Sequence, residues 1–197
     1  MDVEQVARTL LERLEPHGFV AVVGGFALVA HGIQRTTFDL DLMVEREHQD
    51  DIVEVLEALG YETVHRSENF SSHLHPDRDL GRVDLVYVDA ETAATVAGST
   101  RVLPLLGAVR APIACPEHLI AMKLSAIASD PDRRFGDQVD IARLLELPGV
   151  HPETVQPYFE KWGEEALFRQ LCNQAGSEEE DSDGDRSAEQ PDSAARG

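Results

Sequence analysis

The sequence is poor in cysteine and has no long apolar run. Only Cys115 and Cys172 occur among its 197 residues, far apart and without a metal-binding spacing. A disulfide framework is therefore not expected. No apolar stretch reaches membrane-spanning length, and the first residues lack a basic region followed by an apolar run. These absences predict a cytoplasmic protein that makes no contact with a membrane.

Positive charge is scarce as well. The formal net charge is −20, and Lys123 and Lys161 are the only lysines. Residues 176–197 hold eight acids and two arginines, which leaves 29 acids and 15 bases elsewhere, a net charge of −14. A surface this acidic repels nucleic acid, so we expect no extended DNA footprint and only local contact with RNA. Residues 176–197 have almost nothing to bury and are predicted to be disordered.

The apolar fraction of 42% is enough for a core, and its periodicity alternates between helix and strand. Helices are predicted over residues 2–15, 26–31, 50–59 and 90–98. Strands are predicted over residues 19–23, 38–44, 61–65, 70–75, 83–88 and 110–114. Further helices are predicted from residue 116 and over 136–146, 152–161 and 163–173. This order predicts an α/β (α+β) fold with a sheet flanked by helices, followed by a helical C-terminal region.

Three aspartates fall in predicted strands. Asp39 and Asp41 share one face of their strand, about 7 Å apart at the backbone, because side chains alternate between faces. The core-facing positions of that strand are expected to be Phe38, Leu40, Leu42 and Val44. Asp84 enters a later, otherwise apolar strand. Carboxylates that converge on one point are typical of a divalent-cation site.

Phosphate-binding residue types precede the first two aspartates. Gly24 and Gly25 are predicted to form a turn between a buried strand and a short helix, where glycine lets the backbone approach an anion closely at the helix N-terminus. Arg35, Thr36 and Thr37 follow this helix and are candidate partners for phosphate oxygens.

The glycine pair and the three aspartates together resemble the nucleotidyltransferase superfamily typified by DNA polymerase β. Within it, the sequence looks most like the minimal nucleotidyltransferases and the AbiE-type toxin–antitoxin group. Residues 116–126 and 137–141 are similar to the later pattern of those proteins, a helix lysine and a downstream aspartate, so the resemblance covers about residues 5–147. It implies a mixed-sheet catalytic core over 1–114, a helical region over 115–175 and an acidic tail over 176–197.

The resemblance also implies chemistry. Two Mg²⁺ ions would be bound by Asp39, Asp41 and Asp84, with an NTP as substrate. Lys123 would contact phosphate and act in catalysis, and Asp140 would be a second catalytic residue of the helical region.

Several alternatives stay open. The implied acceptor is an RNA such as a tRNA end, a partner protein or a small hydroxylated molecule, and the partner in a toxin–antitoxin pair would be the cognate protein. The rival function is a non-catalytic regulator that binds a partner protein, and a third is an antibiotic adenylyltransferase. His73 and His75 share a strand face and are expected to form a satisfied polar surface rather than a metal contact. Asp137 is expected to cap its helix.

Overall fold

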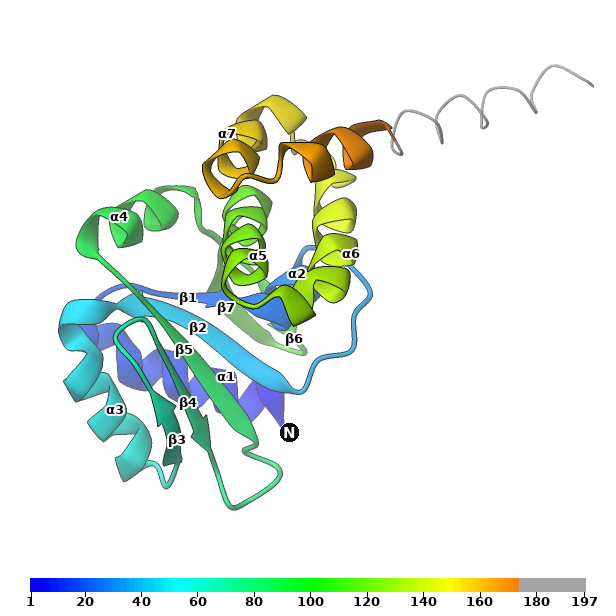
Figure 1. Cartoon of the computed structure of the whole chain (residues 1–197). Coiled ribbons are helices and arrows are strands. Elements are labelled where there is room, and N and C mark those ends of the chain that lie inside the picture. The colour runs from blue at the N-terminus through cyan, green and yellow to red at the C-terminus, as the bar shows by residue number, and fades with distance from the viewer. Residues whose placement is uncertain (174–197) are drawn as a thin grey trace, which may run out of the picture. The chain divides into compact units, whose positions relative to one another are not determined.

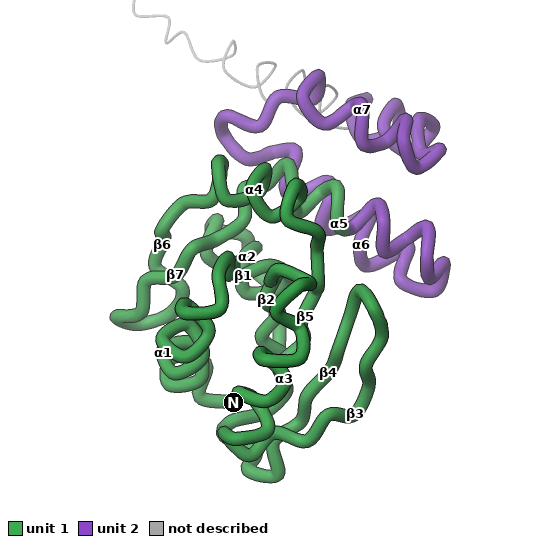
Figure 2. The backbone as a smooth tube through the Cα atoms, turned by 90° about the vertical axis from the view of Figure 1, so that its left-hand side faces the viewer, with its two compact units in different colours: residues 1–122 green, residues 123–197 purple. Residues whose placement is uncertain are grey.

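The computed structural model describes residues 1–173, and the tail predicted over 176–197 lies outside them. The chain divides into two compact units, the first spanning Met1–Met122 and the second beginning at Lys123 (Figure 2). The boundary falls inside helix α5 (Pro116–Ser129). None of the helices in the described part of the chain has the length and apolar character needed to cross a membrane.

Unit 1 is built on a seven-stranded mixed sheet in the order β3-β4-β5-β2-β1-β7-β6 (Figure 1). Its strands are β1 (Val20–Val23), β2 (Asp39–Glu45), β3 (Glu62–Arg66), β4 (Phe70–Leu74), β5 (Arg82–Val88), β6 (Arg101–Leu106) and β7 (Val109–Ile113). Its helices are α1 (Val3–Leu14), α2 (Gly24–Ala30), α3 (Gln49–Ala58), α4 (Ala90–Ser99) and the start of α5, with short 3₁₀ turns at Glu15–His17 and Arg46–His48.

The register of β2 decides which side chains reach the core. Leu40, Leu42 and Val44 are fully buried, and each contributes about 1.5–3 kcal/mol of hydrophobic free energy. A slip of one residue would move these side chains to the other face and place Asp39 and Asp41 in the core. Burial of the apolar set therefore holds the two carboxylates on the opposite face.

Helices α1 and α3 pack together and cover the apolar face of the sheet. Asp2 begins α1 by accepting a hydrogen bond from the Gln5 N–H at 3.1 Å, which satisfies one unpaired donor of its first turn. The spacing of Val6 and Leu10, both almost completely buried, places them on the stripe that faces the sheet.

Unit 2 is helical. It contains the rest of α5, a 3₁₀ turn at Pro131–Arg133, α6 (Arg134–Leu145), α7 (Pro152–Trp162) and a helical segment over residues 165–173. Phe159 is fully buried and its ring lies 5.0 Å from that of Phe168. Gly163 ends α7 with a φ of 71°, a conformation that favours glycine.

The predicted α/β class with a mixed sheet is confirmed, and three details differ. The edge strand β6 was not predicted, because Pro104 interrupts its pattern, although proline is tolerated at a sheet edge. Gly24 and Gly25 form the first two residues of α2 rather than a turn before it. The prediction that Phe38 faces the core is wrong: its side chain is 75% exposed, because β2 begins only at Asp39.

Candidate active site

Gly24 lies directly against the carboxylate of Asp41. It has a φ of +61°, and a Cβ atom added to it would stand 2.0 Å from Asp41 Oδ2. Gly25 lies against Thr37 in a similar way, since its Cβ would lie 2.5 Å from Thr37 Oγ1. The glycine pair therefore has a steric requirement at both positions, and it brings the start of α2 onto the strand that carries the aspartates.

The strand register brings Asp84 next to Asp41. Strands β2 and β5 are parallel, and Asp41 is the direct partner of Asp84. Neighbouring strands lie about 4.8 Å apart, and partners in register point to the same face. Asp39, two residues before Asp41, shares that face. The structure thus places all three predicted metal ligands on one face of the sheet, opposite the apolar face.

Ser72 is a polar neighbour of this group that the sequence did not predict. It is the register partner of Asp84 on the other side, in antiparallel β4, and its hydroxyl donates to Asp84 Oδ1 at 2.6 Å. Its side chain is almost completely buried. A serine in a strand carries no distinctive sequence signal, so only the pairing of β4 with β5 reveals this contact.

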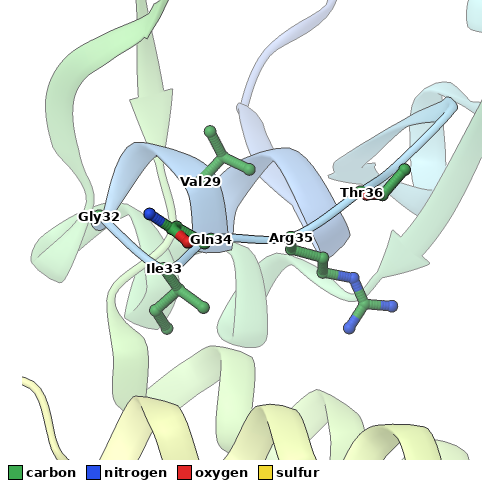
Figure 3. A pocket seen from close by; sticks show the side chains of 6 residues that line it. All are labelled: Val29, Gly32, Ile33, Gln34, Arg35 and Thr36. Carbon is green, nitrogen blue, oxygen red and sulfur yellow. The ribbon is translucent and has the colours of Figure 1, made fainter.

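The loop after α2 lines a pocket of about 500 Å³ (Figure 3). The predicted phosphate partners Arg35 and Thr36 are among its lining residues, with Gln34 beside them. Figure 3 shows the Arg35 side chain extending away from α2. Thr37 is placed differently: its hydroxyl packs on Gly25 and donates to the Asp39 carbonyl at 3.5 Å. Thr37 therefore holds the loop that leads into β2.

Lys123 and Asp140 are brought together within unit 2. Lys123 Nζ lies 2.5 Å from Asp140 Oδ2 and 2.8 Å from Asp137 Oδ1, and the three side chains are 11%, 3% and 5% exposed. The prediction that Asp137 caps its helix is therefore wrong, because Asp137 binds the buried Lys123 and the N-cap residue of α6 is Arg133. Asp137 Oδ2 is buried without a hydrogen bond, 3.4 Å from Arg133 Nε.

His73 and His75 have separate environments. His73 is fully buried on the apolar face, where Nε2 contacts Ser71 Oγ at 2.7 Å and Nδ1 contacts Thr63 Oγ1 at 3.2 Å. Burial lowers the pKa of His73 below its usual value of 6.5. His75 follows β4 and packs edge-on against Tyr61. The expectation that the histidines have hydrogen-bond partners fits the contacts of His73. The expectation that His73 lies on a polar surface is wrong, because its side chain is fully buried.

A second group of potential metal ligands lies at the far end of β2. Ligand atoms of Glu45, Glu47 and His48 lie within 4.8 Å of one another. Glu45 accepts the Phe19 N–H at 3.2 Å, and Glu47 lies 3.4 Å from His48. These contacts explain the cluster as part of the turn between β2 and α3.

Neither a family model nor a curated protein matches the sequence, whereas solved structures match the fold. The solution structure of the antibiotic-resistance factor ANT(2″)-Ia aligns with a TM-score of 0.52 and 16% identity over 93% of this chain and 100% of that chain. The lincomycin-bound lincosamide antibiotic adenylyltransferase LnuA aligns with a TM-score of 0.49 and 19% identity over 73% and 97% of the two chains. ANT(2″)-Ia in complex with adenylyl-2″-tobramycin gives 0.49 and 16% over 87% and 98%.

The likeness to ANT(2″)-Ia spans nearly the whole of both chains. The chain therefore has the fold of the nucleotidyltransferases, as its motifs predicted. The assignment to the AbiE-type group stays a prediction.

Proposed function

We propose that this protein is a divalent-metal-dependent nucleotidyltransferase. In the reaction, a hydroxyl oxygen of the acceptor bonds to the α-phosphorus of an NTP while the bond from that phosphorus to the bridging oxygen breaks. The hydroxyl proton of the acceptor passes to solvent, the NMP group is transferred to the acceptor oxygen, and pyrophosphate leaves.

The observation that carries this proposal is the row of acidic residues beside the glycine pair. Asp41 stands between Gly24 on one side and its strand partner Asp84 on the other. Like charges on adjacent strands repel each other, so an arrangement that keeps two carboxylates in register suits a site that binds cations. The residue types fit Mg²⁺, because this ion prefers carboxylate oxygens and completes its shell with water and phosphate.

Asp39, Asp41 and Asp84 are the proposed metal ligands. Bound Mg²⁺ would neutralise the charge of the triphosphate and of the leaving pyrophosphate. The chain's own contribution is placement: Gly24 permits close approach to Asp41, and Thr37 holds the loop before Asp39. Arg35 and Thr36 are proposed to bind phosphate oxygens from the pocket that they line.

Lys123 and Asp140 remain predicted catalytic residues. Lys123 already binds two carboxylates at 2.5 and 2.8 Å, so contact with phosphate would require an exchange of partners. The same cluster has a clear structural use, because it joins α5 to α6. The two roles are separable by the neutral variants described in the Discussion.

Among the acceptors, we favour a small hydroxylated molecule that carries positive charge. The net charge of −14 outside residues 176–197 attracts a cation and repels a polyanion such as RNA. The structural neighbour ANT(2″)-Ia is an antibiotic-resistance factor, which is consistent with a small-molecule acceptor. RNA and a partner protein are the competing acceptors.

The function is tested by incubating the full chain with Mg²⁺ and each α-³²P-labelled NTP. Acceptor pools of aminoglycosides and lincosamides, total RNA, and co-encoded proteins are supplied separately. We expect label on one pool only, with loss of transfer in Asp84→Ala and retention in the matched control Glu47→Gln. Higher salt should weaken the reaction if the acceptor is a small cation.

The rival function is a regulator that acts by binding. It predicts no NTP binding and no transfer to any pool, together with tight association with a co-encoded protein that persists in Asp84→Ala. Label transfer that depends on Asp84 would exclude it.

A further inference from the structure

Strand β4 contains three consecutive buried polar residues. Ser71, Ser72 and His73 are 0%, 4% and 0% exposed, and β4 lies inside the sheet between β3 and β5. Burial of a polar side chain is unfavourable unless hydrogen bonds replace those to water. Each of the three residues therefore calls for a partner that explains its presence.

Ser71 and His73 are explained by contacts on the apolar face of the sheet. Ser71 Oγ lies 2.7 Å from both Tyr87 OH and His73 Nε2, and His73 Nδ1 lies 3.2 Å from Thr63 Oγ1. This chain of hydrogen bonds links β3, β4 and β5. Its effect is structural, because it fixes the middle of β4 relative to its two neighbours.

Ser72 points to the opposite face, since successive side chains of a strand alternate. Its hydroxyl donates to Asp84 Oδ1 at 2.6 Å, the short distance typical of a hydroxyl bound to a charged carboxylate. Asp84 in turn is the register partner of Asp41. Ser72, Asp84 and Asp41 thus form a row across β4, β5 and β2.

We propose that Ser72 is a positioning residue that sets the orientation of the Asp84 carboxylate and thereby the affinity of the acidic row for a divalent cation. The inference rests on the proposed function. A carboxylate rotates readily about its terminal torsion, and a hydrogen bond to one oxygen selects one orientation. A ligand held in place before binding loses less entropy when the cation arrives, which is why partners of metal ligands influence affinity.

Ser71 supplies a matched control for the loss of one buried hydroxyl. Ser71→Ala removes hydrogen bonds on the apolar face, whereas Ser72→Ala removes the bond to Asp84. Ser72→Thr keeps the hydroxyl on a side chain that suits a strand. The three variants separate weakened packing from altered positioning.

The test measures Mn²⁺ binding to the full chain through the electron paramagnetic resonance signal of the free ion. Mn²⁺ is titrated alone and with the α,β-methylene analogues of ATP, GTP, CTP and UTP, which block transfer. We expect Ser72→Ala to raise the dissociation constant for Mn²⁺ about 10-fold or more, as changes in partners of metal ligands do. Ser71→Ala should lower the melting temperature and keep the wild-type affinity, and Ser72→Thr should restore most of it.

Wild-type Mn²⁺ affinity in Ser72→Ala would overturn the inference, and so would equal weakening in Ser71→Ala and Ser72→Ala. Asp84→Ala separates this failure from that of the proposed function. If Asp84→Ala loses Mn²⁺ binding while Ser72→Ala retains it, only the role of Ser72 is wrong. If Asp84→Ala binds Mn²⁺ like the wild type, the proposed metal site fails and the inference fails with it.

Discussion

The sheet of unit 1 and the helices of unit 2 both bring aspartates together. On the sheet, Asp84 has another carboxylate, Asp41, as one register neighbour and the Ser72 hydroxyl as the other. Between α5 and α6, Asp137 and Asp140 share the ammonium group of Lys123. The Ser72 hydroxyl donates a hydrogen bond to Asp84, whereas Lys123 places a positive charge between Asp137 and Asp140.

Because of this difference, we expect the aspartates of the sheet to act in binding and catalysis, and those between α5 and α6 to act in stability. An acidic row on a sheet face suits an exchangeable cation, so changes there should affect binding and catalysis more than folding. A buried ion cluster with its own lysine contributes to the stability of the fold mainly when all members are present. Removal of one member leaves an uncompensated buried charge. Mutations in the two clusters should therefore have opposite profiles.

The largest effect is expected for Asp41→Asn. It keeps the shape of the side chain and removes one charge from the row, so NMP transfer should fall by about 10²–10³-fold or more. The melting temperature should change little. Rates are measured by pyrophosphate release and stability by calorimetry, with Glu47→Gln as the control. Unchanged transfer in Asp41→Asn would contradict the proposed site.

Lys123→Met should mainly destabilise the fold. It leaves Asp137 and Asp140 buried without their lysine, a loss of about 3–5 kcal/mol in the free energy of unfolding. A triple variant that adds Asp137→Asn and Asp140→Asn removes the unpaired charges and should recover much of that stability. Urea denaturation measures both.

The triple variant also tests the predicted catalytic role of Lys123 and Asp140. Recovered stability without recovered NMP transfer would support that role. Recovery of both would show that the cluster acts in folding alone.

Gly24→Ala should impair both activity and stability. The new Cβ would stand 2.0 Å from Asp41 Oδ2, and a φ of +61° costs a residue with a side chain roughly 1–2 kcal/mol. Displacement of Asp41 should lower transfer about 100-fold. Gly98→Ala is the control, because nothing lies within 4 Å of its added Cβ in helix α4, and it should be neutral or slightly stabilising.

The smallest effect is expected from the titration of His73. Burial lowers its pKa in the folded state, so the unfolded chain takes up a proton more readily. Its contribution to stability is complete above pH 6.5, the usual pKa, and decreases as the pH falls below it, by up to about 1.4 kcal/mol per pH unit. The free energy of unfolding measured against pH should have a shallower slope in His73→Gln. His118, whose pKa is also lowered by burial, adds a slope of the same sign in both proteins.

Local patterns predicted much of unit 1. The apolar run before Gly24 and the alternation after Asp39 are decided by neighbouring residues, and β1, α2 and β2 formed near the expected positions. Phe38 was misassigned because alternation predicts a face only inside a strand, and the strand begins one residue later. Strand β6 was missed because Pro104 weakens a pattern that an edge position tolerates.

Contacts between segments that are distant in the sequence were harder to predict from local patterns. Lys123 was predicted to contact phosphate and Asp137 to cap its helix, whereas their pairing depends on the packing of α5 against α6. Ser72 gave no signal at all, because its role depends on the register between β4 and β5.

By itself, the sequence determined the glycine pair and the common face of Asp39 and Asp41, because backbone periodicity acts over a few residues. Together these features predicted the nucleotidyltransferase fold. The tertiary structure alone decided that Asp84 stands between Asp41 and Ser72, and that Lys123 is buried with two aspartates. Strand register and helix packing are set by burial of the whole apolar core, which no single stretch of the chain contains.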